Sequence, residues 1–173
     1  VAYKNVISTR RSSRSSMEAS VHEFKDNAAS PHLEKFKSMI EEELTKIVDE
    51  VMALLNDKLI PNTRGKNDEA EVFYLKMAGD YHRYLAEFMD GAAKEEKANG
   101  ANDYYQKAQE VASNLPTTHP IRLGLALNYS VCLYEIMNKT QDACNLAKTA
   151  FDDAISKLDE LDEASYKDST LIM

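Results

Sequence analysis

The sequence has few cysteines, no long apolar run and no excess of positive charge, and each absence narrows the class of protein. Its two cysteines, Cys132 and Cys144, lie in apolar helical surroundings and predict buried, reduced thiols of a cytosolic protein. No apolar segment is long enough to span a bilayer, and no signal-peptide core opens the chain. We therefore expect a soluble protein of the cytoplasm, with the nucleus as a further location.

The charge balance excludes two broad classes of partner. The chain has 21 basic and 29 acidic residues, a formal net charge of −8. General nucleic-acid binding and attachment to an anionic membrane both need a wide basic surface, so neither is expected. An anion-binding site here must be a local basic cluster. The length of 173 residues fits a single domain covering residues 1–173, and the residues at its ends, Val1 and Met173, suggest that both ends are cut.

The motifs of common enzyme classes are missing. The sequence contains no GxGxxG, no GxxxxGK followed by Ser or Thr, no GxSxG and no HExxH. The four histidines, His22, His32, His82 and His119, lie at least ten residues apart, so no i, i+4 pair is available for a metal. Adjacent acidic residues fall on the polar faces of helices, where solvation is their ordinary role. We expect neither an enzyme nor a metal or cofactor.

No segment shows the alternation of a strand, whereas apolar residues recur at helical spacing throughout. The expected helices cover residues 1–25, 31–60, 71–91, 104–115, 121–138 and 140–158, with a seventh beginning at 165–173. The segments between them read as loops, among them a charged loop over residues 94–103 with Asn99-Gly100 at its turn. The fold class predicted is all-α, an array of antiparallel helices joined by short loops.

Several helix starts carry local signals. Ser30-Pro31 and His119-Pro120 each place a proline in a first turn. Asn67 or Asp68 is expected to cap the helix that contains Glu71, and Glu71 lies where the capping-box partner of Asp68 would lie. Thr140 is expected to cap the helix that follows it.

Basic residues form two stripes of the same spacing. Lys76 and Arg83 are seven residues apart, about two helical turns, and Tyr84 follows on the same side. Lys4 and Arg11 repeat this spacing near the start of the chain. The stripes could bind a doubly charged anion between them. The alternative is that these side chains simply face water, as most lysines and arginines on amphipathic helices do.

The helix over residues 121–138 is apolar on most sides but carries polar groups on one face. Leu127, Asn128, Val131 and Glu135 follow helical spacing on that face. An exposed asparagine there can hydrogen-bond an extended peptide backbone through both its donor and its acceptor. The alternative is an asparagine whose hydrogen bonds are satisfied inside the helix array. The residues alone leave both interpretations open.

Four stretches of the chain strongly resemble the 14-3-3 proteins and together cover 73 of its 173 residues. They are VAYKNV at 1–6 with Arg10-Arg11-Ser12-Ser13, VFYLKMAGDYHRYLAE at 72–87, PTTHPIRLGLALNYSV at 116–131, and ACNLAKTAFDDAISKLDELDEASYKDSTLIM at 143–173. The resemblance implies a horseshoe of nine antiparallel helices, normally a homodimer. It also implies a concave groove that grips phosphoserine or phosphothreonine peptides of client proteins, without catalysis and without a cofactor.

The resemblance also implies roles for individual residues. The phosphate-binding cluster would be Lys4, Arg11, Arg83 and Tyr84. The peptide groove would be formed by Lys76, Leu127, Asn128, Val131, Glu135 and Ile172. Arginine forks and a phenol hydroxyl suit the three acceptor oxygens of a phosphate, and Arg-cluster recognition of phosphorylated motifs is a known mode of which the 14-3-3 proteins are a standard example.

The chain departs from the family pattern in places. Relative to the family it lacks the first two helices, which form the dimer, and nearly all of the last helix, so a homodimer is expected only of a full-length member. Arg14 stands where the family usually has tryptophan, and His82 replaces a usual tyrosine. The alternatives to a phosphopeptide adaptor are a helical scaffold for unmodified peptides and a remnant of the fold that has lost ligand binding.

Overall fold

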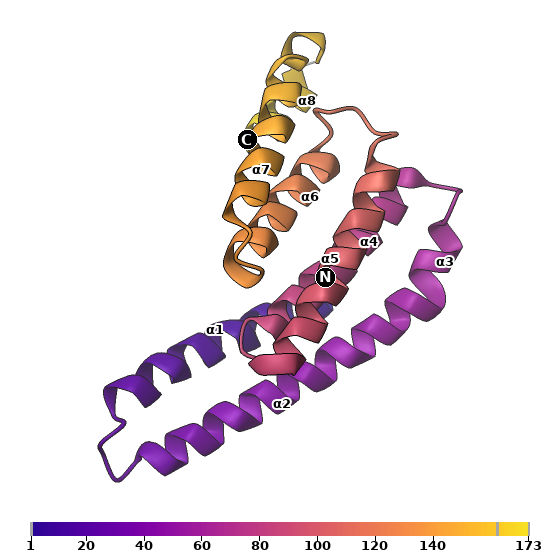
Figure 1. Cartoon of the computed structure of the whole chain (residues 1–173). Helices are drawn as coiled ribbons and strands as arrows, with labels where there is room; N and C mark the ends of the chain where they lie inside the picture. The colour runs from indigo at the N-terminus through magenta and orange to yellow at the C-terminus, as the bar shows by residue number, and fades with distance from the viewer. Residues whose placement is uncertain (1, 162, 173) are drawn as a thin grey trace. The chain divides into compact units, whose positions relative to one another are not determined.

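The computed structural model describes residues 2–161 and 163–172, most of which lie in helices (Figure 1). No strand occurs among these residues, and the all-α prediction is confirmed. Val1 and Met173, which bounded the first and last expected helices, lie outside the described residues. None of the described helices combines the length and the apolar character needed to cross a membrane.

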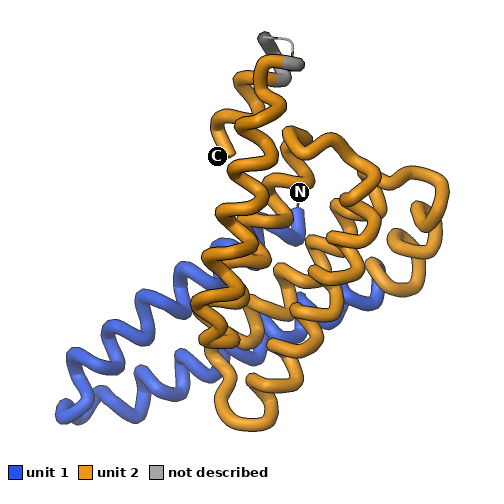
Figure 2. Tube along the Cα trace, turned by 45° about the horizontal axis from the view of Figure 1, so that its top comes forward, with its two compact units in different colours: residues 1–54 blue, residues 55–173 orange. Residues whose placement is uncertain are grey.

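The chain divides into two compact units, residues 1–54 and residues 55–173 (Figure 2). The candidate site residues are distributed over both units, with two of them in the first. The single domain expected from the length of the sequence stays a prediction.

The first unit is a pair of helices. Helix α1 (Ala2–Glu23) and helix α2 (Ser30–Leu54) lie side by side and run antiparallel (Figure 1). The start of α2 at Ser30-Pro31 is as predicted. Helix α1 continues through its serine-rich half, although serine is a weak helix former.

Ion pairs between α1 and α2 help to explain why the serine-rich half stays helical. Arg10 Nη2 contacts Glu43 Oε1 at 2.7 Å, and Arg14 Nε contacts Glu41 Oε1 at 3.0 Å. Both pairs are partly exposed, so each contributes little alone. Arg14, which replaces the tryptophan of the resembled family, thus has an ionic partner on α2.

The second unit contains the remaining helices in chain order. They are the π-helical turn η1 (Leu55–Leu59), α3 (Ile60–Thr63), α4 (Asp68–Ala86), α5 (Gly91–Ala112), α6 (Pro120–Val131), the π-helical turn η2 (Cys132–Ile136), α7 (Thr140–Ile155), the 3-10 turn η3 (Leu158–Glu160) and α8 (Glu163–Thr170).

The expected end of the second helix before Pro61 is wrong. Helix α2 gives way to the π-helical turn η1 at Leu55, and α3 then carries Pro61 in its first turn. Proline is tolerated there because the N–H that it lacks would have no partner within the helix. The polar connection to α4 is correspondingly shorter than predicted.

The charged loop expected at residues 94–103 is also wrong. Helix α5 runs without a break through Asn99-Gly100. A Cβ on Gly100 would lie 2.5 Å from Cδ2 of His82 on α4, so glycine gives the two helices room to approach. The packing of α5 against α4 outweighs the weak helix propensity of glycine, which is about 1 kcal/mol poorer than alanine.

The cap of α4 is Asn67, whose Oδ1 accepts a hydrogen bond from the N–H of Ala70 at 3.0 Å. Glu71 is not its capping-box partner. The Oε2 atom of Glu71 instead accepts from the N–H of Gly65 at 2.9 Å and holds the preceding turn, where Gly65 has a φ of 67°.

The starts of α6 and α7 agree with the sequence to within a residue. His119 Nδ1 accepts from the N–H of Ile121 at 3.2 Å and caps α6, with Pro120 in the first turn. Lys139 rather than Thr140 is the residue before α7, and it follows Asn138, whose φ of 56° ends the preceding turn.

Helices α4 and α5 pack along each other and form the centre of the second unit (Figure 1). Small side chains dominate where the two helices meet, and Ala78, Ala101 and Ala108 are fully buried. Tyr105 is the large exception, a completely buried ring that lies over Gly79. The close approach of the helices brings this tyrosine within reach of charged groups on α4.

Candidate functional site

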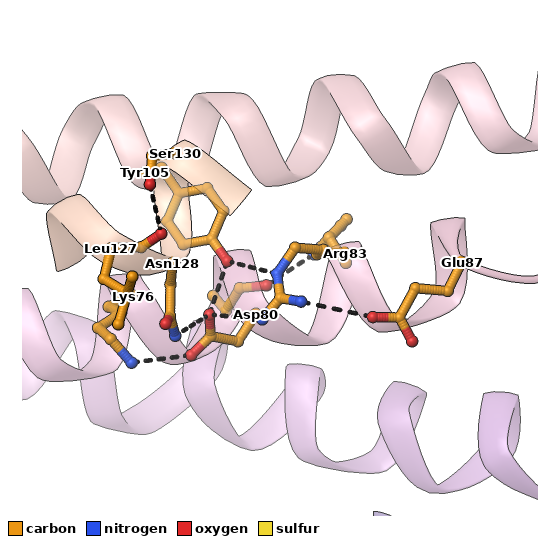
Figure 3. Close-up of polar contacts among 10 residues, drawn as sticks. Lys76, Asp80, Arg83, Glu87, Tyr105, Leu127, Asn128 and Ser130 are labelled. Atoms are coloured by element: carbon orange, nitrogen blue, oxygen red, sulfur yellow. Dashed lines mark hydrogen bonds and ion pairs between the residues drawn. The ribbon is translucent and has the colours of Figure 1, made fainter. Parts of the chain in front are cut away.

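Helix α4 places Lys76, Asp80 and Arg83 on one face, because residues three and four apart are neighbours on a helix. Figure 3 shows Asp80 between the two cations, with Tyr105 of α5 and Asn128 of α6 reaching it from other helices. We call these five residues the Asp80 cluster. All of them belong to the second unit.

Asp80 is the centre of the cluster. Its Oδ1 accepts hydrogen bonds from Tyr105 Oη at 2.6 Å and from Asn128 Nδ2 at 2.8 Å, and its Oδ2 accepts from Lys76 Nζ at 3.0 Å. Arg83 Nη2 lies 3.6 Å from Oδ1. Only 8% of Asp80 is exposed, so these partners replace the water that a carboxylate would otherwise bind.

Arg83 is also buried and hydrogen-bonded to neighbouring side chains. It is 7% exposed, its Nε donates to Tyr105 Oη at 3.2 Å, and its Nη1 donates to Glu87 Oε1 at 3.4 Å. The ring of Tyr84 lies 4.8 Å from the guanidinium carbon, a cation–π contact. The alternative that Arg83 simply faces water is wrong, because this helix face is covered by α5 and α6.

The electrostatic surroundings keep Arg83 charged. Burial alone lowers its pKa, but Tyr105, which accepts from Nε, and the Asp80 carboxylate together raise the pKa of Arg83 above its ordinary value. Burial, and after it the negative charge of Asp80, raise the pKa of Tyr105 well above 10.0. Tyr105 therefore stays a protonated phenol that donates to Asp80 while accepting from Arg83.

The charges on this part of α4 cancel. Lys76 and Arg83 contribute two positive charges, and their partners Asp80 and Glu87 contribute two negative ones. Arg83 has five N–H groups. Its hydrogen bonds to Tyr105 and Glu87 use two of them, and Nη2 forms an ion pair with Asp80 at 3.6 Å, so the described contacts leave Arg83 donors for a ligand.

Two of the predicted groove residues border an open pocket of about 320 Å³ between α6, α7 and the end of α8. Leu127 is 49% exposed, and Phe151 of α7 and Ile172 line the same pocket. Of the other predicted groove residues, Val131 is half-buried at the end of α6 and Glu135 is exposed on η2.

The predicted phosphate cluster draws on both units. Lys4 is exposed and Arg11 half-buried on α1 of the first unit, whereas Arg83 and Tyr84 belong to the second. Within the second unit, the structure joins Lys76, Arg83 and Asn128 through Asp80. The four-residue phosphate cluster as a whole stays a prediction.

Sequence reasoning missed Asp80 and Tyr105. Asp80 is four residues after Lys76 and three before Arg83, a spacing typical of ion pairs on a helix, so a search for such pairs could have found it. Nothing in the sequence marks Tyr105, which is 25 residues from Asp80. The prediction that both cysteines are buried also fails for Cys144, which is exposed on α7.

Comparison with known proteins identifies the family. A family model described as 14-3-3 protein matches residues 1–173. The chain belongs to the 14-3-3 family. It is 54% identical over 177 residues to the 14-3-3-like protein GF14-F of Oryza sativa subsp. japonica, an alignment that covers 100% of this chain and 67% of that protein. It is 52% identical over 178 residues to Protein BMH2 of Saccharomyces cerevisiae, covering 100% of this chain and 64% of that protein.

This chain therefore spans about two thirds of the length of these 14-3-3 relatives. The resemblance found in the sequence is confirmed. 14-3-3 proteins are non-catalytic adaptors, and family membership supports a role in phosphopeptide binding in general. Among the described residues, no group of three or more His, Cys, Asp or Glu side chains is placed to hold a metal ion.

Proposed function

We propose that this 14-3-3 chain is an adaptor that binds phosphoserine or phosphothreonine peptides of client proteins, with Arg83 and Tyr84 binding the phosphate together with Lys4 and Arg11. The observation that supports this most directly is the state of Arg83. A buried, permanently charged guanidinium that keeps donors for a ligand is a prepared anion site, because its solvation and orientation are already provided by Tyr105 and Asp80.

The net charge of the side chains around Arg83 supports a contribution of basic residues from α1 to phosphate binding. The ionised side chains around Arg83 sum to zero, whereas a phosphorylated serine carries about −1.5 to −2 charges at neutral pH. Lys4 and Arg11 would raise the local sum to two positive charges, which matches the charge of the ligand. A plain serine offers no such charge, so the site should discriminate strongly in favour of the phosphorylated peptide.

The test is a titration of one peptide, in phosphorylated and plain forms, with the parent protein and with the variants Arg83→Glu and Arg11→Glu. Binding is measured by fluorescence polarisation. Hydrogen bonds to charged groups contribute about 1.5–3 kcal/mol each, so either variant should weaken phosphopeptide binding by well over tenfold. Arg64→Glu, at an exposed position outside the cluster, is the matched control and should bind like the parent. Unchanged binding by Arg83→Glu would overturn the assignment. Equal affinity of the parent for both peptides would favour the scaffold for unmodified peptides.

A further inference from the structure

A pocket of about 160 Å³ lies between α5, α6 and α7, all of which belong to the second unit. Figure 1 shows α6 and α7 side by side, and α5 packs against α6. We call it the Arg122 pocket. Among the described residues that line it, none belongs to the predicted phosphate cluster or to the predicted peptide groove. A ligand of this pocket would therefore be distinct from the phosphopeptide.

The lining of the Arg122 pocket combines apolar surface with two opposite charges. Leu123, Leu125 and Ala126 of α6 are buried and supply apolar surface. Arg122 of α6 and Asp153 of α7 are the charged residues among those described as lining it. Pockets that bind small molecules have this composition, in which mostly apolar walls carry a few polar groups that orient the ligand.

The guanidinium of Arg122 is anchored and still has donors for a ligand. Arg122 is half-buried, and its Nη1 donates to the carbonyl oxygen of Leu115, in the turn after α5, at 2.6 Å. Within the described part of the chain, no carboxylate pairs with Arg122. A guanidinium has five N–H groups, so the anchored side chain can also bind an anionic group in the pocket.

Asp153 brings the opposite charge from α7. Its backbone carbonyl oxygen accepts from Thr117 Oγ1 at 3.3 Å, which ties α7 to the loop before α6. Its side chain is exposed and forms no ion pair with any other residue that the structure describes. Arg122 and Asp153 thus line one pocket but lie too far apart to pair with each other. The space between them suits a ligand that carries both charges.

We propose that the Arg122 pocket binds a free α-amino acid with a small apolar side chain, such as valine. Arg122 binds the carboxylate of the ligand, Asp153 binds its ammonium group, and the apolar surface of α6 receives its side chain. The site goes beyond phosphopeptide binding and does not depend on it.

Size and charge select this class of ligand. A cavity of roughly 150 Å³ accommodates a molecule the size of benzene, so the pocket has room for a small amino acid but not for a nucleotide. The charges of Arg122 and Asp153 sum to zero. A zwitterion therefore meets a complementary partner at each end, whereas a simple anion also meets Asp153 and a simple cation also meets Arg122.

The experiment is an NMR titration of the isotope-labelled parent protein with L-valine. The site is small and partly hydrated, so we expect a dissociation constant of about 1 mM, with shifts concentrated in the amides of α5, α6 and α7 around the pocket. Isovalerate lacks the ammonium group and isobutylamine lacks the carboxylate. Each should bind at least about tenfold more weakly, the usual scale of one charge-assisted hydrogen bond.

This first titration uses the unaltered protein, so its result does not depend on the folding of a variant. The absence of saturable shifts with valine, shifts centred on another part of the chain, or equal affinity for either analogue would each overturn the proposal. The carboxylate half is tested by isobutylamine alone, because Arg122 also holds the carbonyl of Leu115 and its replacement would change the turn as well as the charge.

Asp153→Asn tests the ammonium half at an exposed position. Valine should bind about tenfold more weakly and isovalerate no more weakly than to the parent, so the two affinities become nearly equal. A merely structural disturbance would weaken both ligands alike. Asp152→Asn is the matched control, because this carboxylate pairs with Lys148 at 2.6 Å and is not among the groups described as lining the pocket, and it should bind valine like the parent. An unreduced preference for valine over isovalerate in Asp153→Asn would refute the proposed site.

Discussion

The ring of Tyr105 lies directly against the backbone of Gly79, so that a Cβ on Gly79 would be 2.8 Å from the ring atoms Cδ1 and Cε1. That separation is shorter than van der Waals contact allows. The glycine lets Tyr105 approach α4 closely enough for its hydroxyl to reach Asp80, the next residue along the helix. A missing side chain on one helix thus determines where a hydroxyl on the other lies.

Gly79→Ala should therefore destabilise the protein, although alanine favours a helix more than glycine does. Overpacking of a filled core typically costs about 1–3 kcal/mol, against a propensity gain of about 1 kcal/mol. Gly124→Ala is the matched control, because its nearest neighbour is Lys76 Cε at 3.8 Å, and it should stabilise α6 by up to about 1 kcal/mol. Urea unfolding of both variants checks this, and an unaltered Gly79→Ala midpoint would contradict it.

Tyr105→Phe should keep the ring and lose only the hydroxyl. The stacking on Tyr129, with ring centroids 5.2 Å apart, would survive, but Asp80 and Arg83 would each lose a buried partner. Hydrogen bonds to charged groups contribute about 1.5–3 kcal/mol, so we expect a loss of that order in the free energy of unfolding. Tyr134→Phe, where the tyrosine is 58% exposed, should change it by less than about 0.5 kcal/mol. Equal effects of the two changes would argue against the hydrogen bonds as the cause.

The two cysteines should differ greatly in reactivity. Burial, opposed by Arg83 and assisted by Asp80, raises the pKa of the Cys132 thiol from 9.0 to about 11. A shift of this size lowers the thiolate fraction at pH 8 about 100-fold, and the thiolate is the species that reacts. Iodoacetamide should accordingly alkylate exposed Cys144 first, with Cys132 at least about 100-fold slower, as mass spectrometry of timed samples would show. Both should react alike in 6–8 M urea, roughly the range that unfolds small proteins. Comparable rates in the native protein would refute the burial of Cys132.

Alkaline pH should weaken the fold. Burial, Tyr84 and Asp80 raise the pKa of Tyr81 from 10.0 to about 12, so the unfolded chain loses this proton before the folded one does. Cys132 behaves in the same way between pH 9 and about 11. Stability linked to these groups is complete below pH 9 and falls as the pH rises toward 12.

This pH dependence can be measured from urea midpoints between pH 8 and 11.5. The fall should be shallower in Tyr81→Phe, which keeps the ring and removes the titrating hydroxyl. Tyr166→Phe, which changes a half-exposed tyrosine on α8, should follow the parent curve. A parent midpoint that stays level across the range would show that Tyr81 and Cys132 do not titrate as the structure indicates.

Helix starts could be predicted from the sequence because their causes are local. Ser30-Pro31, Asn67 and His119-Pro120 each lie at the observed start of a helix, as the sequence predicted. Resemblance to a family added what local patterns do not contain, namely the expectation that the stripe of Lys76 and Arg83 does more than face water.

The remaining features depend on contacts that the sequence does not display. Helix α5 passes through Asn99-Gly100 because Gly100 receives the ring of His82 from α4, and the same two residues would form a turn in an isolated peptide. The role of Asp80 likewise requires Tyr105 and Asn128, which lie 25 and 48 residues away. The roles of Gly100 and Asp80 therefore depend on the packing of α4 against the neighbouring helices, which the sequence does not display.

The short turn between α4 and α5, residues 87–90, has a consequence for the kinetics of folding. Closing a short loop costs little chain entropy, and contacts between neighbouring helices form fast. We expect the α4–α5 hairpin to belong to the folding nucleus, with the Asp80–Tyr105 bond present in the transition state and Asn128 joining later from α6. Arg83 would then be oriented by Tyr105 before α6 has docked on α4.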